Sequence, residues 1–443
     1  MAAKTYRRLR NALVAMLVLA AAFAAYRYTL HRMVEAKLDE IRKQGFPVTL
    51  AELDKWSPQP PKGENAADIY REAFAKNVKD RPERNVPIVG YSNLPPRGVS
   101  LTPVMREGIA GYLKTNEESL VLLHTAAAMP HCRFYTNLNV DTISFSGGGG
   151  MRQAARKLEL ETVYASDSGD RESTTKALLA SIGLVRHFSD EPLAIPRLVQ
   201  QACFGLTKDA LERALSTLQF DSNQLGRVST ALHETEASLT ISRVMASEMA
   251  WNDDAFSEMR RDNKSAGYQI TTDYGNMKDS SAWNRNLLAF GYRYLGILDF
   301  DQLNYLRLGS TAVGISEQPL PQRIYALNTF AHETNQISAF LPESRLYIKL
   351  SCQFLNLDAR FMASLRTARA GLSVESHRSE HGQLPDNLSP TFTDPFDGQP
   401  LRYKKLAKGY VVYSIGEDRK DDGGVEPKHG YLPGTDITFT VER

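Results

Sequence analysis

The pattern of apolar and polar positions predicts a long first helix with an apolar first half. Residues 12–26 are fifteen consecutive apolar residues, a length between the core of a cleavable signal peptide and a full membrane span of about 20 residues. Residues 22–24 offer a small-residue cleavage site. The helical spacing nevertheless continues past them, through Leu30, Met33, Val34, Leu38 and Ile41, and ends at residues 45–47. The pattern therefore favours an uncleaved signal anchor over a cleaved signal peptide.

The charge around this apolar run bears on its orientation. Four basic residues and no acid precede it, namely Lys4, Arg7, Arg8 and Arg10, whereas five basic residues follow it within residues 27–43. Long downstream regions cross a membrane largely regardless of such charge. We therefore expect a short cytoplasmic N-terminal tail and about 400 residues beyond the membrane. The competing interpretation is a buried helix of a cytosolic protein, which the dense flanking arginine disfavours.

Beyond this helix the chain is predicted to be mainly α-helical. Residues 56–61 contain three prolines and form a stiff spacer, and Asn65 is the expected N-cap of the helix that follows. Helices are expected over residues 103–128 and, as a hairpin, over 151–166 and 171–188, because Gly169 suits a left-handed C-cap and Asp170 an N-cap. The glycines at 147–150 are expected to form a flexible connector, and residues 262–285 a long loop. No strict period recurs, so the helices form irregular hairpins rather than a repeat array.

The last 86 residues change character. A helix over residues 358–381 is stopped by Gly382 and Pro385, and two short strands with alternating side chains follow it, within residues 394–405 and 409–416 and joined by a turn at 405–409. A third strand is predicted near residues 435–442. The fold class is therefore mainly α, in four segments: a signal anchor and juxtamembrane helix over 1–45, a proline-rich linker over 46–62, a domain of irregular helical hairpins over 63–357, and a small α+β module over 358–443.

Composition and charge exclude several classes of protein. The chain has 443 residues, 42% hydrophobic and 23% charged, which is ordinary for a globular protein. A net charge of +2 argues against a nucleic-acid partner. That total hides a difference, because residues 1–43 carry +6 and the remaining residues −4. Three widely spaced cysteines exclude a disulfide framework and a cysteine-based zinc module.

Two clusters could bind a metal ion. Asp418, Asp421 and Asp422 lie on a glycine-rich stretch, with Asp436 following, and carboxylates grouped in this way are typical calcium ligands. Taken alone, the same residues are better explained as a solvated turn. His377-Arg378-Ser379-Glu380-His381 fits the inverted zinc-protease motif, which needs two histidines on one helical face and a glutamate to activate water. It stands at the end of a helix, where His381 and Gly382 are also explained as a helix stop.

The motifs of the C-terminal module occur in a distinctive order. His-Gly-x-Leu-Pro begins at 381, Asp-Pro-Phe-Asp-Gly at 394, Gly-Tyr-x-x-Tyr-Ser-x-Gly-x-Asp at 409 and Asp-Asp-Gly-Gly at 421. This order resembles the C-terminal half of the major pseudopilin of type II secretion systems, over about a fifth of the chain. In that family a C-terminal loop binds a structural calcium ion. The resemblance implies the same role for Asp418 and Asp436, and less directly for Asp421 and Asp422.

The resemblance stops short of the N-terminus. A pseudopilin has a prepilin-peptidase site directly before its apolar helix, whereas Arg10-Asn11 stands there in this chain. The complete layout is similar to that of a large group of uncharacterised bacterial membrane-anchored proteins. This similarity implies a single-pass protein of the inner membrane with its body in the periplasm.

Three functions follow as hypotheses. The first is a non-enzymatic structural or interaction protein that binds a protein partner and has a calcium-stabilised C-terminal loop. The second is an extracytoplasmic metal-dependent hydrolase that uses His377, Glu380 and His381. The third is an accessory component of a machine similar to the type II secretion system.

Overall fold

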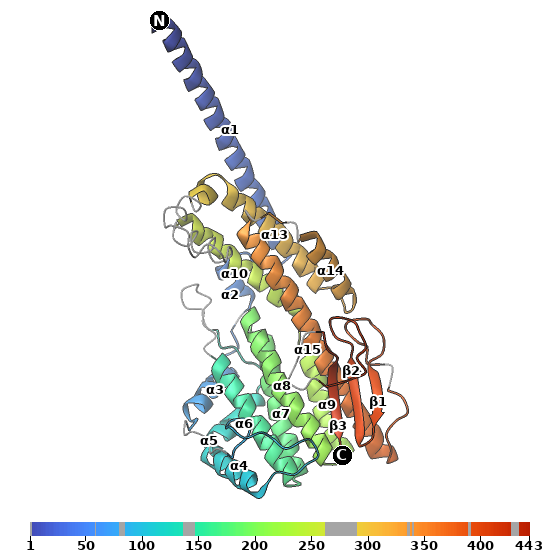
Figure 1. The fold of residues 1–443 in the computed structure, drawn as a ribbon. Coiled ribbons are helices and arrows are strands. Elements are labelled where there is room, and N and C mark those ends of the chain that lie inside the picture. Colours follow the sequence, from blue (N-terminus) through green and yellow to red (C-terminus); the bar gives the residue numbers. More distant parts are fainter. Residues whose placement is uncertain are drawn as a thin grey trace. The chain divides into compact units, whose positions relative to one another are not determined.

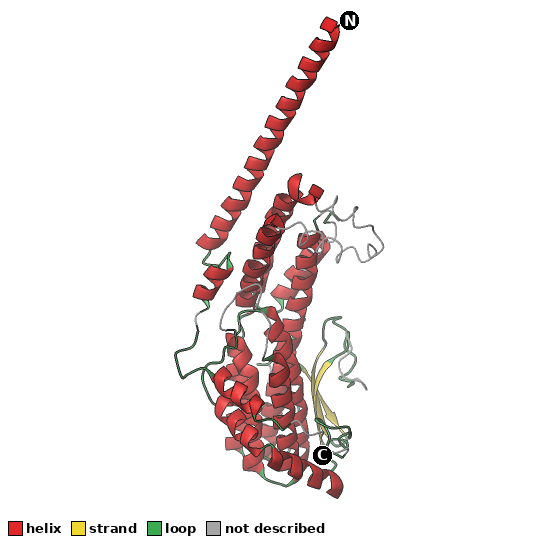
Figure 2. Cartoon of the chain, turned by 90° about the vertical axis from the view of Figure 1, so that its left-hand side faces the viewer, coloured by secondary structure: helices red, strands yellow, loops and turns green. Residues whose placement is uncertain are grey.

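The computed structural model describes residues 2–57, 59–78, 85–135, 147–261, 290–334, 337–338, 341–388, 391–426 and 434–443. These residues are mainly helical and include one small three-stranded sheet, which confirms the predicted fold class (Figures 1 and 2). The chain divides into two compact units. Unit 1 contains Met1–Trp56, Met245–Ser316 and Leu327–Gln353, and unit 2 contains Ser57–Val244, Glu317–Ala326 and Phe354–Arg443.

Unit 1 is built on the first helix, α1 (Ala2–Lys43). No glycine or proline interrupts these 42 residues, so the helix is continuous (Figure 1). Its first half is exposed on all sides. Its second half buries Leu30, Val34, Leu38 and Ile41 and packs against α13 (Ile297–Ser316). These are the positions of the predicted stripe, of which only Met33 stays exposed.

The remaining helices of unit 1 are α2 (Leu50–Trp56) and parts of α10 (Ile241–Arg261), α14 (Gln322–Thr334) and α15 (Pro342–His381). Asp301 on α13 fixes the start of α15, because its carboxylate accepts hydrogen bonds from the amides of Glu343 and Ser344, each at 3.1 Å. A buried carboxylate is stable there because the amides at a helix N-terminus lack partners within the helix. The residues predicted as a long loop, 262–285, lie outside the described residues.

Two helices of unit 2 begin with the side-chain caps that the sequence predicts. Asn65 accepts a hydrogen bond from the amide of Ala67 at 3.1 Å, and Asp170 from the amide of Ser173 at 3.0 Å. Gly169 has φ +78°, which confirms the predicted hairpin. The elements are α3 (Ala66–Ala75), α4 (Pro103–Thr115), α5 (Glu117–Ala127), α6 (Gly148–Asp167), α7 (Arg171–His187), the 3-10 turn Phe188–Asp190, α8 (Ala194–Thr217) and α9 (Ser222–Ala237).

Two local expectations are wrong. The helix predicted over 103–128 is broken at Asn116, a buried residue whose side-chain amide donates to the carbonyl of Tyr112 at 3.1 Å. The glycines at 147–150 form the first turn of α6 instead of a flexible connector. A Cβ on Gly150 would lie 2.4 Å from the ring of Phe74, and one on Gly147 would lie 2.8 Å from Phe134. These glycines therefore allow a helix to approach two aromatic rings closely, which periodicity alone does not reveal.

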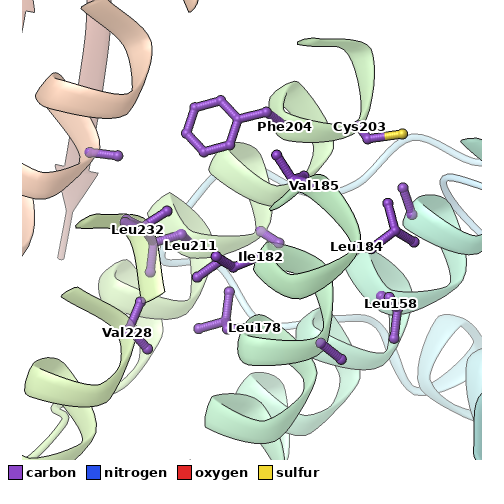
Figure 3. Close-up of a cluster of buried hydrophobic side chains, with 14 of the residues drawn as sticks. Leu158, Leu178, Ile182, Leu184, Val185, Cys203, Phe204, Leu211, Val228 and Leu232 are labelled. Carbon is purple, nitrogen blue, oxygen red and sulfur yellow. The ribbon is translucent and has the colours of Figure 1, made fainter. Parts of the chain in front are cut away.

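The core of unit 2 lies where α6, α7, α8 and α9 meet. Figure 3 shows Leu178 and Ile182 of α7 facing Leu211 of α8 and Val228 of α9. Burying each such side chain contributes about 1.5–3 kcal/mol, so this cluster holds the four helices together.

The sheet has the order β1-β2-β3, with all neighbours antiparallel, and comprises β1 (Arg402–Leu406), β2 (Gly409–Ser414) and β3 (Ile437–Glu442). It packs on α15 through Tyr410 and Phe439, both fully buried. The hydroxyl of Tyr410 donates to the carbonyl of Gly371 at 2.9 Å. A Cβ on Gly371 would lie 2.3 Å from the ring of Phe439, so this glycine sets how closely helix and sheet approach.

Candidate functional site

A cavity of about 480 Å³ lies in unit 2 between α8, α15 and the start of β3. Phe204 and Phe361 contribute an aromatic wall, and their rings meet edge to face at 5.3 Å. The charged lining residues are Arg97, Lys208, Asp209, Arg360, Glu426 and Asp436. This volume is within the range of pockets that bind small molecules or single side chains of a partner.

Beside the cavity, three side chains of α8 bind the outer edge of β3. Lys208 donates to the carbonyl of Thr438 at 2.9 Å, Glu212 accepts from the amide of Thr440 at 2.9 Å, and Ser216 accepts from the amide of Glu442 at 3.0 Å. Every fourth residue of the helix meets every second residue of the strand, because four helical residues rise about 6 Å and two strand residues about 6.7 Å. We call this set of contacts the α8–β3 rail. It occupies a sheet edge that would otherwise be open to pairing.

Glu212 is the buried centre of this rail. Its side chain is fully buried, and Arg97 lies 3.3 Å from one carboxylate oxygen and Lys208 3.8 Å from the other. Burial raises the pKa of Glu212 to about 7, although both cations act to lower it. Arg97 also pairs with Glu426 and, at 4.0 Å, with Glu442. The charges along this wall of the cavity therefore form one paired network that ties β3 to α8.

Of the four aspartates predicted to bind calcium, Asp436 lines this cavity. Asp418, Asp421 and Asp422 are exposed on the loop after β2, whereas Asp436 is only 2% exposed and precedes β3. Asp421 accepts from the amide of Gly423 at 2.9 Å and from the hydroxyl of Tyr413 at 3.1 Å. Asp418 accepts from the amide of Lys420 at 3.1 Å. Hydrogen bonds of this kind are typical of polar turns, which was the alternative interpretation of this loop.

Asp436 differs from the other three. One of its carboxylate oxygens accepts from the amide of Gly424 at 2.8 Å, and the other is buried without a hydrogen-bond partner. Burial raises the pKa of Asp436, the backbone amides of Gly424 and Asp422 oppose this shift, and the carboxylates of Asp421 and Asp422 add to it. The chemistry of the donor set thus fits a cation. Within the described residues, however, no three His, Cys, Asp or Glu side chains form a metal-binding group.

The inverted zinc-protease motif falls on the last turns of α15. The rings of His377 and His381 stack with their centroids 4.2 Å apart, and Nδ1 of His381 is 3.0 Å from the carbonyl oxygen of His377. Glu380 is exposed on the same turn. Among the described residues no third acid, histidine or cysteine completes a metal site with them.

Sequence reasoning missed the role of Asp394, the first residue of the Asp-Pro-Phe-Asp-Gly motif. This carboxylate is 1% exposed and accepts from the amides of Phe396 and Ile415, both at 3.0 Å, and from the hydroxyl of Ser414 at 2.8 Å. Arg402 pairs with it at 2.8 Å. Asp394 therefore joins the segment before β1 to the end of β2. The motif itself was the available signal for part of this role, because an aspartate in such a turn commonly accepts a hydrogen bond from the amide two residues on, as Asp394 does from Phe396.

Sequence reasoning also missed Glu159 on α6, which is 5% exposed and has a carboxylate oxygen with no hydrogen-bond partner. Burial raises its pKa to about 8, and the charge of Asp209 adds to this effect. No sequence signal distinguishes Glu159 from an exposed helical glutamate.

No known protein family, curated protein or solved structure matches this chain. The cavity in unit 2 is lined by two aromatic rings and by charged side chains of both signs.

Proposed function

We propose that this protein is an uncleaved, signal-anchored protein of the bacterial inner membrane whose periplasmic body acts by binding a protein partner. The observation that carries this proposal is α1. Within the described residues it is the one helix long and apolar enough to cross a membrane, and its most apolar stretch is not buried by the rest of the chain. A signal sequence meets the same criterion. The continuation of the helix into the packed stripe from Leu30 to Ile41 supports a retained anchor.

The test of the anchor uses the full chain with a C-terminal tag, expressed in a Gram-negative bacterium. We expect a carbonate-resistant membrane protein whose intact mass includes residues 1–24. Protease should remove the tag only after the outer membrane has been permeabilised. A soluble product lacking those residues would show that the signal is cleaved, and a protected tag in spheroplasts would show the opposite orientation.

The cavity supports a binding role. Its wall combines two aromatic rings with charged groups of both signs, a composition that suits a polypeptide segment with mixed side chains. Asp209 lines the cavity and can engage a basic residue of the partner. Burial raises the pKa of Asp209, and the charges of Lys208 and Arg97 oppose this shift.

The test of partner binding is photo-cross-linking in cells. A photoreactive amino acid is placed at Ser364 in the cavity and, as the control, at Val121, which is 59% exposed on α5. A discrete adduct from position 364 that is absent from position 121 is the expected result. Equal labelling at both positions, or no adduct at position 364, would contradict a partner at the cavity.

We also propose that calcium orders the acidic loop. The unpartnered oxygen of Asp436 and the carboxylates of Asp421 and Asp422 that raise its pKa support this role, and Asp418 is the fourth ligand implied by the resemblance. When bound, the ion would neutralise this negative charge.

We predict that millimolar Ca²⁺ raises the melting temperature of the full-length protein in detergent and that a chelator reverses the effect. Asp436→Ala should abolish the shift, whereas Asp386→Asn should retain it, because Asp386 is exposed and pairs with Lys405. An unchanged melting temperature in the wild type would remove calcium from the proposal.

A second candidate, an accessory component of a machine similar to the type II secretion system, is supported by the order of elements in residues 354–443. A long helix, three antiparallel strands and an acidic loop follow one another as the resemblance implies. Co-purification of a secretion subunit with the cross-linked protein would favour this role. If no secretion subunit co-purifies from membranes of a strain that expresses the machine, that result would count against this role.

A further inference from the structure

Unit 1 exposes a compact group of aromatic and apolar side chains. Phe290 is 54% exposed, Tyr294 44%, Leu295 58% and Tyr26 48%. The rings of Phe290 and Tyr294 lie 4.6 Å apart, and the guanidinium of Arg293 lies over the ring of Tyr294 at 5.2 Å. We call Tyr26, Phe290, Tyr294 and Leu295 the juxtamembrane patch. Exposed aromatic and apolar residues that adjoin one another generally mark a binding surface.

This patch adjoins the end of the apolar run of α1. A Cβ on Gly296 would lie 3.1 Å from the ring of Tyr26 and 3.0 Å from Cδ of Arg27, so the segment 290–296 lies directly against the last residue of the run. Arg27 also donates to the carbonyl of Tyr294 at 2.9 Å and pairs with Asp299 at 2.7 Å. The side chain of Asp299 is only 6% exposed. These contacts hold Arg27, and with it this end of the span, to residues 294–299 of unit 1.

The length of the span brings the lipid surface to this point. The fifteen apolar residues 12–26 rise about 22 Å as a helix, whereas the hydrocarbon core of a bilayer is about 30 Å thick. Basic residues before the run can extend towards the headgroups to reduce the difference. Arg27 at the other end is held by Asp299 and cannot extend away from the bilayer with the same freedom. Drawing the patch into the headgroup region would meet this shortfall.

We propose that the juxtamembrane patch is a lipid-binding surface that embeds in the interface of the same bilayer that α1 crosses. The proposal rests on the membrane anchoring proposed above. Tyrosine and phenylalanine beside an arginine are suited to this environment, because an aromatic ring lies among the acyl chains near the headgroups while the cation reaches the phosphates. The contact therefore gives unit 1 a second attachment to the membrane beside the span itself.

The test uses the full-length protein in phospholipid vesicles, with a tryptophan introduced at the patch. Phe290→Trp and Leu295→Trp replace patch residues by a fluorescent interfacial residue. The matched control is Leu350→Trp, an exposed position of unit 1 on α15. The amide of Glu343, at the start of α15, donates to Asp301, and Leu350 lies seven residues, or about 10 Å, further along that helix. Lipids brominated near the headgroup quench tryptophan on contact, and the wild type supplies the background from the native tryptophans.

We expect the brominated lipids to quench the added fluorescence at 290 and 295 by at least a third, and that at 350 by less than a tenth. Equal quenching at all three positions, or none at 290 and 295, overturns the lipid contact. A third outcome also overturns the lipid contact: the added tryptophans are not quenched at low protein density but become buried at high protein density. That result would indicate that a second copy or another protein covers the patch. Failure of the protein to float with the vesicles refutes the anchor instead, so the two proposals fail separately.

Discussion

The buried carboxyl of Glu159 provides a quantitative test of the structure of unit 2. A carboxyl whose pKa rises from 4.5 to about 8 on folding is protonated in the folded protein at pH 7 but ionised in the unfolded chain. The unfolded chain therefore binds fewer protons, and the contribution of Glu159 to stability falls as the pH rises between these two values. This pKa shift lowers the free energy of unfolding by about 3 kcal/mol at pH 7 and by about 5 kcal/mol above pH 8, and hardly changes it at pH 4.

Glu159→Gln removes the ionisation but retains the size of the side chain. We expect the variant to exceed the wild type in stability by roughly 3 kcal/mol at pH 7, with the difference vanishing near pH 4. For a unit of about 290 residues this gain corresponds to a melting temperature about 5 °C higher. The measurement is thermal unfolding of the full chain in detergent across pH 4–9. Glu107→Gln, at an exposed position on α4, is the control and should show no difference.

The decisive feature is the dependence on pH. A gain that is the same at pH 4 and pH 8 would mean that the amide improves packing, and would refute the assignment of a raised pKa. Asp209→Asn supplies a second check, because removing that neighbouring charge should lower the pKa of Glu159 and reduce the effect of Glu159→Gln.

Two further substitutions test the contacts of the sheet by thermal unfolding. Gly371→Ala should destabilise unit 2 by about 1–3 kcal/mol, because the new methyl group meets the ring of Phe439. The control is Gly226→Ala on α9, where the new methyl group meets no other atom, and it should be neutral or stabilising. Similar changes in stability for both variants would contradict the close approach of α15 and β3. Glu212→Ala should cost about 3–5 kcal/mol, because it leaves the buried amide of Thr440 without its acceptor and removes the carboxylate that Arg97 and Lys208 share. Glu212→Gln should cost less, and equal losses would argue against the rail.

The sequence by itself determined the elements whose causes are local. The apolar run of α1, the caps at Asn65 and Asp170 and the alternation in the two hairpin strands each depend on residues within a few positions of one another. Such patterns follow from helix and strand periodicity and from the hydrogen-bonding capacity of short polar side chains. They were sufficient for the fold class, and for the positions of the acidic loop and the histidine motif along the chain.

The tertiary structure decided what depends on residues distant in sequence. Position 150 of α6 requires glycine because Phe74 lies 2.4 Å from where a Cβ would be, and Glu212 is an ionisable core residue because β3 runs beside α8. Similarly, Arg27 pairs with Asp299, a partner 272 positions away, instead of extending freely towards lipid headgroups. Burial and pairing are properties of the assembled chain, since the same side chain is solvated or enclosed according to what packs against it.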